Sequence, residues 1–188
     1  MFATPRSQNI GDTMKMLIEK LPDLQALYVK ELRLFLSAEE MIAIKAPLMA
    51  EAAIDPDLIH LFRQHIQETH LHADRVRGIL NRATGEADPL KCKVVYSLFD
   101  ELEDVMEDAS HPPVRDAALI SEAQRIEQYE MASFAALRQL ACALELGQDA
   151  QLLDQSYREK ERACEQLTVI AKRIYPAARK TAYANKAA

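Results

Sequence analysis

Glutamates and histidines recur at positions that the hydrophobic pattern places on the inner faces of long helices. Glu68 and His72 are four residues apart and Glu127 and Glu130 are three apart, so each pair projects from one face of a helix. Two further segments each carry one acid on the apolar stripe. The candidate ligands are therefore Glu39, Glu68, His72, Glu127, Glu130 and Glu159. Carboxylates joined by an imidazole are ligands that suit iron or manganese.

Prolines and a glycine divide the chain into the elements that must position these groups. Proline stands at a helix start in residues 55–57 and 111–113, and Gly147 follows a helix end. The predicted helices cover residues 22–51, 56–83, 89–108, 113–146 and 148–174. Their short connections favour antiparallel neighbours. We therefore expect an all-α antiparallel four-helix bundle, with the additional short helix between two long hairpins.

The same pattern sets the expected domain boundaries. Residues 22–175 form the predicted bundle, residues 1–21 an N-terminal extension, and residues 176–188 a flexible basic tail.

The acids lie at similar depths in the four long helices, so antiparallel packing would bring them to one level near the middle of the bundle. Carboxylates that converge in a core of low dielectric repel one another unless they are protonated or neutralised by cations. Single glutamates on two helices, with an acid and a partner on the other two, are typical of bundles that bind two metal ions. We predict a site for two iron ions, and the single imidazole leaves manganese as the alternative.

Three further residues near these stripes receive other predictions. His65 lies one turn before Glu68 and is expected to donate to a ligand carboxylate rather than to bind metal. Tyr129 is expected to be a redox-active or supporting phenol, or simply to pack between helices. Glu101 lies beside the apolar stripe of the short helix, where a solvated position is expected. We predict no catalytic residue beyond the metal ligands.

Composition excludes several other classes of protein. The chain has 188 residues with only 4 Gly, which are too few for a β-rich fold and provide no Rossmann or P-loop fingerprint. Its net charge of −6 disfavours nucleic acid as a partner. No apolar run is long enough to span a membrane, and the N-terminal residues carry no apolar segment of the secretory type, so a cytoplasmic protein is expected.

Four segments of the chain resemble the YciE/YciF group of bacterial ferritin-like stress proteins. They are FLSAEEMI (35–42), FRQHIQETHLHADRV (62–76), VRDAALISEAQRIEQYEMASFAAL (114–137) and LLDQSYREKERACEQLTVIA (152–171). The resemblance implies a ferritin-like bundle, often a homodimer, with a site of the di-iron type and a ferroxidase-like role in stress.

The resemblance also assigns positions. The recurrent acids of the family match Glu39, Glu68, Glu127, Glu130 and Glu159, and His72 falls where relatives carry Gln or His. It implies an oxidoreductase of the ferroxidase type that uses O₂ or peroxide. Two alternatives stay open at this point. One is a non-catalytic structural or partner-binding stress protein, and the other is peroxide disproportionation of the manganese catalase type.

Overall fold

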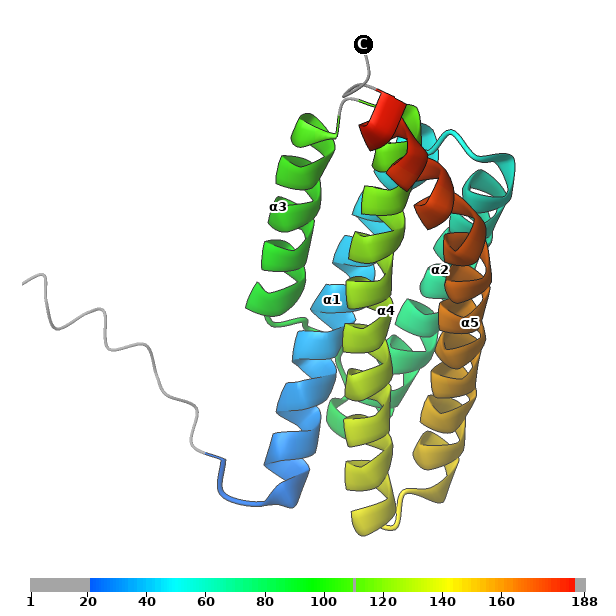
Figure 1. The fold of residues 1–188 in the computed structure, drawn as a ribbon. Coiled ribbons are helices and arrows are strands. Elements are labelled where there is room, and N and C mark those ends of the chain that lie inside the picture. The colour runs from blue at the N-terminus through cyan, green and yellow to red at the C-terminus, as the bar shows by residue number, and fades with distance from the viewer. Residues whose placement is uncertain (1–20, 110, 185–188) are drawn as a thin grey trace, which may run out of the picture.

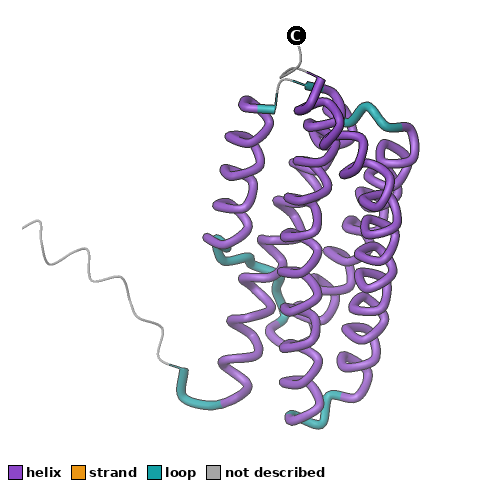
Figure 2. Tube along the Cα trace, in the orientation of Figure 1, coloured by secondary structure: helices purple, strands orange, loops and turns teal. Residues whose placement is uncertain are grey.

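Five helices make up the described part of the chain, residues 21–109 and 111–184 of a computed structural model. They are α1 (Leu24–Ala52), α2 (Pro56–Thr84), α3 (Lys93–Asp108), α4 (Pro112–Ala143) and α5 (Gly147–Ala184). The described residues contain no strand (Figure 2), so the predicted all-α class is confirmed. All but one residue of the predicted N-terminal extension lie outside the described residues.

The four long helices form two hairpins that pack side by side. Helix α1 packs mainly against α2, and α4 against α5; α2 contacts α5 and α1 contacts α4 to join the hairpins. Neighbouring helices run in opposite directions (Figure 1). The short helix α3 connects the hairpins and packs on the outside of α1 and α4. The predicted antiparallel bundle, with a short helix between two long hairpins, is therefore confirmed.

The helix ends follow local signals in the sequence. The side chain of Asp23 accepts a hydrogen bond of 2.8 Å from the backbone N–H of Ala26 and so caps α1. Asp55 caps α2 in the same way, and Pro56 occupies the first turn, where its missing N–H costs nothing. Helix α2 ends at Thr84 and is capped by Gly85, whose φ of 83° is a left-handed conformation that other residues rarely adopt.

Two helix boundaries differ from the prediction by four residues or more. Helix α3 begins at Lys93 rather than at residue 89, because Cys92 before it is extended and the N–H of Leu90 bonds to the carbonyl of Arg33 on α1 at 3.0 Å. Helix α5 continues through Pro176 to Ala184, so it extends beyond the boundary predicted for the bundle at residue 175. Figure 1 shows this last part of α5 bending across the end of the bundle, as expected where proline lacks the N–H of the helical ladder.

The apolar stripes of all five helices meet in one core. Its largest fully buried apolar side chains are Tyr28, Leu32, Leu36, Leu58, Ile79, Leu80, Leu119, Ile120, Phe134, Leu137 and Leu153. This core surrounds a small set of buried charged groups in the middle of the bundle, which therefore lie in a region from which water is largely excluded.

Asp116 connects α4 to the turn between α1 and α2. Its two carboxylate oxygens accept the backbone N–H groups of Ile54 and Asp55 at 2.8 and 3.0 Å, and the residue is buried. Replacing Asp116 with alanine removes both acceptors. We expect the free energy of unfolding to fall by about 2–4 kcal/mol, since each amide left without a partner costs roughly 1–3 kcal/mol. Urea denaturation measures this change, and the exposed Asp104→Ala on α3 is the control; equal effects of the two variants would contradict the role of Asp116.

Candidate metal centre

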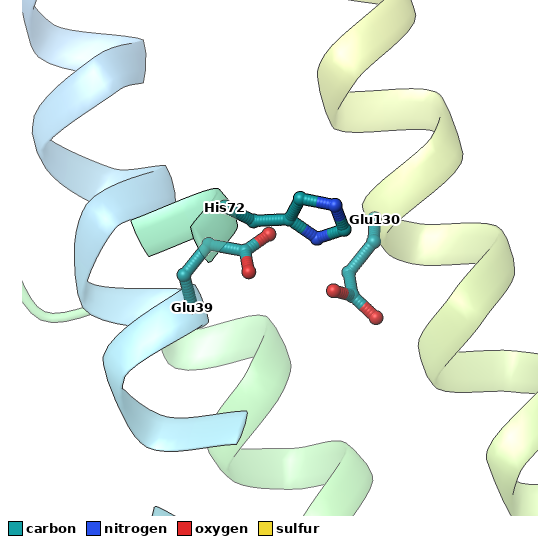
Figure 3. A group of neighbouring side chains, drawn as sticks. All are labelled: Glu39, His72 and Glu130. Atoms are coloured by element: carbon teal, nitrogen blue, oxygen red, sulfur yellow. The ribbon is translucent and has the colours of Figure 1, made fainter. Parts of the chain in front are cut away.

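Three side chains from three different helices converge in the middle of the bundle. Glu39 comes from α1, His72 from α2 and Glu130 from α4, and each is fully buried, with 0% of its surface exposed. One ligand atom from each lies within 4.8 Å of the others. Figure 3 shows the two carboxylates and the imidazole turned toward one another.

Several atoms of this cluster have no hydrogen-bond partner among the described residues. Neither carboxylate oxygen of Glu39 is bonded, and the same holds for Nδ1 of His72. Buried polar atoms are almost always satisfied in native structures. A bound cation would satisfy these carboxylate oxygens and the ring nitrogen beside them, so their lack of partners indicates a cation site.

The orientation of His72 is fixed from outside the cluster. Its Nε2 lies 2.8 Å from Oε2 of Glu159, and Glu159 in turn forms an ion pair with Arg75 of α2. Burial favours a high pKa for Glu159, but hydrogen bonds from Arg75, Gln155 and His72 outweigh it and lower the pKa to about 2. The ionised carboxylate keeps the proton of His72 on Nε2, so Nδ1 presents its lone pair to Glu39 and Glu130.

Burial controls the protonation of the three residues when no cation is present. It raises the pKa of Glu39 well above the usual range, with a further contribution from the charge of Glu130. The pKa of Glu130 is raised to about 7, again chiefly by burial. The pKa of His72 falls to about 4, because burial and then the charge of Lys160 disfavour the imidazolium. Near neutral pH the imidazole is thus neutral, while Glu39 and a fraction of Glu130 hold protons that a metal ion would have to displace.

A second set of charges lies directly beside this cluster. Lys160 of α5 is 1% exposed, and its Nζ is 2.7 Å from Oε1 of Glu130 and 3.5 Å from Oε2 of Glu127. Burial alone would lower the pKa of Lys160, but the charges of the two glutamates overcome it and raise the pKa above its ordinary value. Nδ1 of His65 lies 3.1 Å from the other oxygen of Glu127. Lys160 is the residue of this centre that the sequence stripe did not reveal.

Two predicted ligands, Glu68 and Glu159, lie away from the cluster, and a third, Glu127, lies beside it without belonging to it. Glu68 is only half-buried, because Thr69 takes the inner position on α2. Its Oε1 accepts a hydrogen bond of 2.9 Å from Gln64. Its predicted place on the buried stripe is therefore wrong. Glu159 is also half-buried and reaches the cluster only through His72. Glu101 is exposed, as expected.

Tyr129 and His65 lie next to the centre rather than in it. The Tyr129 hydroxyl is 3.0 Å from Sγ of Cys92, and burial together with this contact raises the pKa of the phenol. Tyr129 also lines a cavity of about 520 Å³ between α1, α4 and the start of α3, together with Phe35 and Leu137. Nδ1 of His65 lies next to Glu127, and its role as a donor to a ligand carboxylate stays a prediction.

The protonation of the cluster predicts how the metal-free protein responds to pH. In the folded state the pKa values of Glu39 and Glu130 lie above their value in the unfolded chain, about 4.3. Their contribution to stability is complete below that value and is lost as the pH rises through about 7. His72 acts in the opposite direction, but only below about pH 6.5. The melting temperature of the metal-free protein should therefore fall between about pH 6.5 and 8.

An excess of Mn(II) should reverse this trend, because deprotonation of the carboxyls favours metal binding. Thermal denaturation with and without Mn(II) across this range measures both slopes. Identical slopes with and without metal would contradict the proposed cluster.

None of the described helices combines the length and the apolar character needed to cross a membrane.

Comparisons with known proteins agree on the family and the fold. A family model described as "Domain of unknown function (DUF892)" matches residues 23–180. Protein YciF of Escherichia coli (strain K12) is 32% identical over 136 residues, which are 72% of this chain and 82% of that protein.

Solved structures show the same architecture. The crystal structure of the E. coli stress protein YciF has a TM-score of 0.79 at 28% identity and covers 83% of this chain and 99% of its own. YcfI from Rhodopseudomonas palustris, described as a putative structural protein, has a TM-score of 0.78 at 24% identity and covers 80% and 96%. A protein from Xanthomonas campestris has a TM-score of 0.70 at 18% identity and covers 86% and 99%. The last two matches show the fold alone.

Proposed function

The chain belongs to the family described as a domain of unknown function, DUF892, and from this premise we propose that it is a metal-binding helical-bundle protein of the ferroxidase type. Glu39, His72 and Glu130 bind iron, with manganese as the alternative metal. The observation that carries the proposal is a group of three buried ligand atoms within 4.8 Å of one another, from three residues that each have a side-chain atom without a hydrogen-bond partner.

The donor set fits such an ion. Two carboxylates and one neutral imidazole form an oxygen-rich site, and such a site suits iron or manganese. Zinc and copper favour sites that are richer in thiolates or imidazoles. Atoms that bind one ion at about 2.1 Å lie at most about 4.2 Å apart. The three ligand atoms lie within 4.8 Å of one another, so small side-chain rotations are sufficient to close the site.

The protein residues around the centre hold and shield the ligands. Glu159 and Arg75 fix the ring of His72, as described above. The rings of Phe35 and Phe134 are both buried, and Phe134 contacts the imidazole edge-on at 5.4 Å between ring centroids. Bound iron would supply the Fe(II)/Fe(III) redox couple, with O₂ or peroxide as the oxidant. The apolar cavity beside Phe35 and Tyr129 offers a small apolar oxidant a place next to the centre.

One observation favours a second candidate function. The ammonium of Lys160 already forms ion pairs inside the centre, and a protein of this fold from Rhodopseudomonas palustris is described as a putative structural protein. A metal-free bundle with a structural role in stressed cells would need no further cation if Glu39 and Glu130 stayed protonated. This candidate predicts no iron oxidation above background.

Anaerobic loading with Fe(II) followed by mixing with aerated buffer separates these candidates. The native protein is expected to consume O₂ and form Fe(III) faster than boiled protein, and Glu39→Gln is expected to remove this acceleration. Oxygen release from added peroxide by Mn(II)-loaded protein would instead indicate peroxide disproportionation. Equal rates for native and boiled protein would contradict the ferroxidase proposal and favour the structural role.

A further inference from the structure

We propose that Lys160 takes the place of a second metal cation, so that the centre holds one divalent ion per chain rather than a pair. This inference rests on the proposed function. It replaces the sequence-based expectation of two ions with a composite site, in which one cation is a metal and the other belongs to the protein.

The position of the ammonium supports this assignment. Lys160 projects from α5, the one long helix that contributes no residue to the cluster of Glu39, His72 and Glu130 in the described part of the chain. Its Nζ lies 2.7 Å from an oxygen of Glu130 and 3.5 Å from an oxygen of Glu127. A second ion beside the first would need these same two oxygens as ligands. Glu130 belongs to the cluster, and Glu127 is the carboxylate next to it. The ammonium therefore competes directly with a second ion.

The buried charges lead to the same stoichiometry. When Glu39, Glu127 and Glu130 are ionised, these carboxylates contribute three negative charges and Lys160 contributes one positive charge. Glu159 is balanced by Arg75. The remaining two negative charges match one divalent cation. A second divalent ion would leave an excess of positive charge in the dry core, where unpaired charge is strongly disfavoured.

The packing of α5 keeps the lysine inside. Long lysine side chains usually carry their charge to the surface, yet Lys160 is 1% exposed. Its inner neighbours on the helix, Ser156 and Ala163, are small and buried, which leaves space for the lysine stem. The ammonium is thus a fixed component of the centre rather than a surface charge that swings away when metal arrives.

Metal stoichiometry tests the proposal through Lys160→Met, which keeps the length of the side chain and removes the charge. Lys172→Met, at an exposed position of the same helix, is the matched control. Each protein is loaded anaerobically with excess Mn(II), desalted and analysed by native mass spectrometry. We expect one ion per chain in the native protein and in Lys172→Met, and two ions in Lys160→Met.

Each outcome has a defined meaning. Two ions in the native protein, or a single ion in Lys160→Met, would overturn the role of Lys160 while leaving metal binding intact. No ion in the native protein or in Lys160→Met would overturn the proposed function itself.

A second measurement needs no variant. The electron paramagnetic resonance spectrum of the Mn(II)-loaded native protein should be that of an isolated ion, with resolved hyperfine structure. A spectrum of spin-coupled manganese would overturn the proposal even if Lys160→Met failed to fold.

Discussion

Glu39→Gln is expected to weaken Mn(II) and Fe(II) binding by about 100-fold or more. Residues that only support a ligand already contribute about 10–100-fold to metal affinity, and Glu39 is a proposed ligand with both oxygens otherwise unsatisfied. The amide keeps the shape of the side chain but removes the negative charge that attracts the cation. Titration against a competing chelator measures the dissociation constants.

Two buried or half-buried glutamates serve as controls for this variant. Glu122 on α4 is buried and forms an ion pair with Arg125 outside the cluster, so Glu122→Gln should leave the affinity within a few-fold of native. Glu68→Gln separates the sequence-based prediction from the structure. We expect it to behave like Glu122→Gln, and a loss as large as that of Glu39→Gln would show that Glu68 is a ligand.

Phe134→Ala is expected to have the largest effect on stability. Phe134 is fully buried, and its ring contacts Phe35 edge-on at 4.6 Å and His72 at 5.4 Å between ring centroids. Removing a buried phenylalanine ring costs the transfer free energy of its atoms and leaves a cavity, together about 3–5 kcal/mol. Urea denaturation of the metal-free protein measures the free energy of unfolding.

The same substitution should also weaken metal binding, because the imidazole of His72 loses one of the surfaces that hold it. Val169→Ala on α5 is the control, since Val169 is 66% exposed and surface changes of this kind usually stay within about 0.5 kcal/mol. A loss of less than about 1 kcal/mol in Phe134→Ala would show that the centre is not tightly packed.

The stripes of α1 and α4 could be predicted closely from the sequence. Their inner positions are dominated by large apolar residues, and the acids Glu39, Glu127 and Glu130 interrupt an otherwise clear pattern. The apolar residues on either side fix the phase of each helix, so the depth of these acids follows from helix geometry alone. These two helices supply the buried carboxylates of the centre, and His72 on α2 is the one proposed ligand that comes from another helix.

On α2 and α5 the inner position predicted near the centre differs by one residue from the position that is buried. Thr69 is buried rather than Glu68, and Lys160 is buried rather than Glu159. Lysine and glutamate are both rarely buried unless they are paired, so residue type alone does not decide between Glu159 and Lys160 on a single helix. The spacing Leu153, Ser156, Lys160, Ala163, Leu167 could have revealed the inner stripe. What justifies a buried lysine is the pair of carboxylates on α4, and one helix considered alone cannot show that partner.

This placement changes the meaning of the negative net charge. Part of the −6 lies inside the bundle, at Glu39, Glu127 and Glu130. Lys160 balances one of these charges within the protein, and a bound divalent ion would balance the rest.

Anomalous X-ray diffraction tests the central claim most directly. Crystals of the native protein grown with Mn(II), measured above and below the manganese absorption edge, should show one strong anomalous peak per chain, bounded by Glu39, Nδ1 of His72 and Glu130. The absence of a peak at saturating Mn(II), or a peak at Glu68 that leaves this cluster empty, would contradict the account.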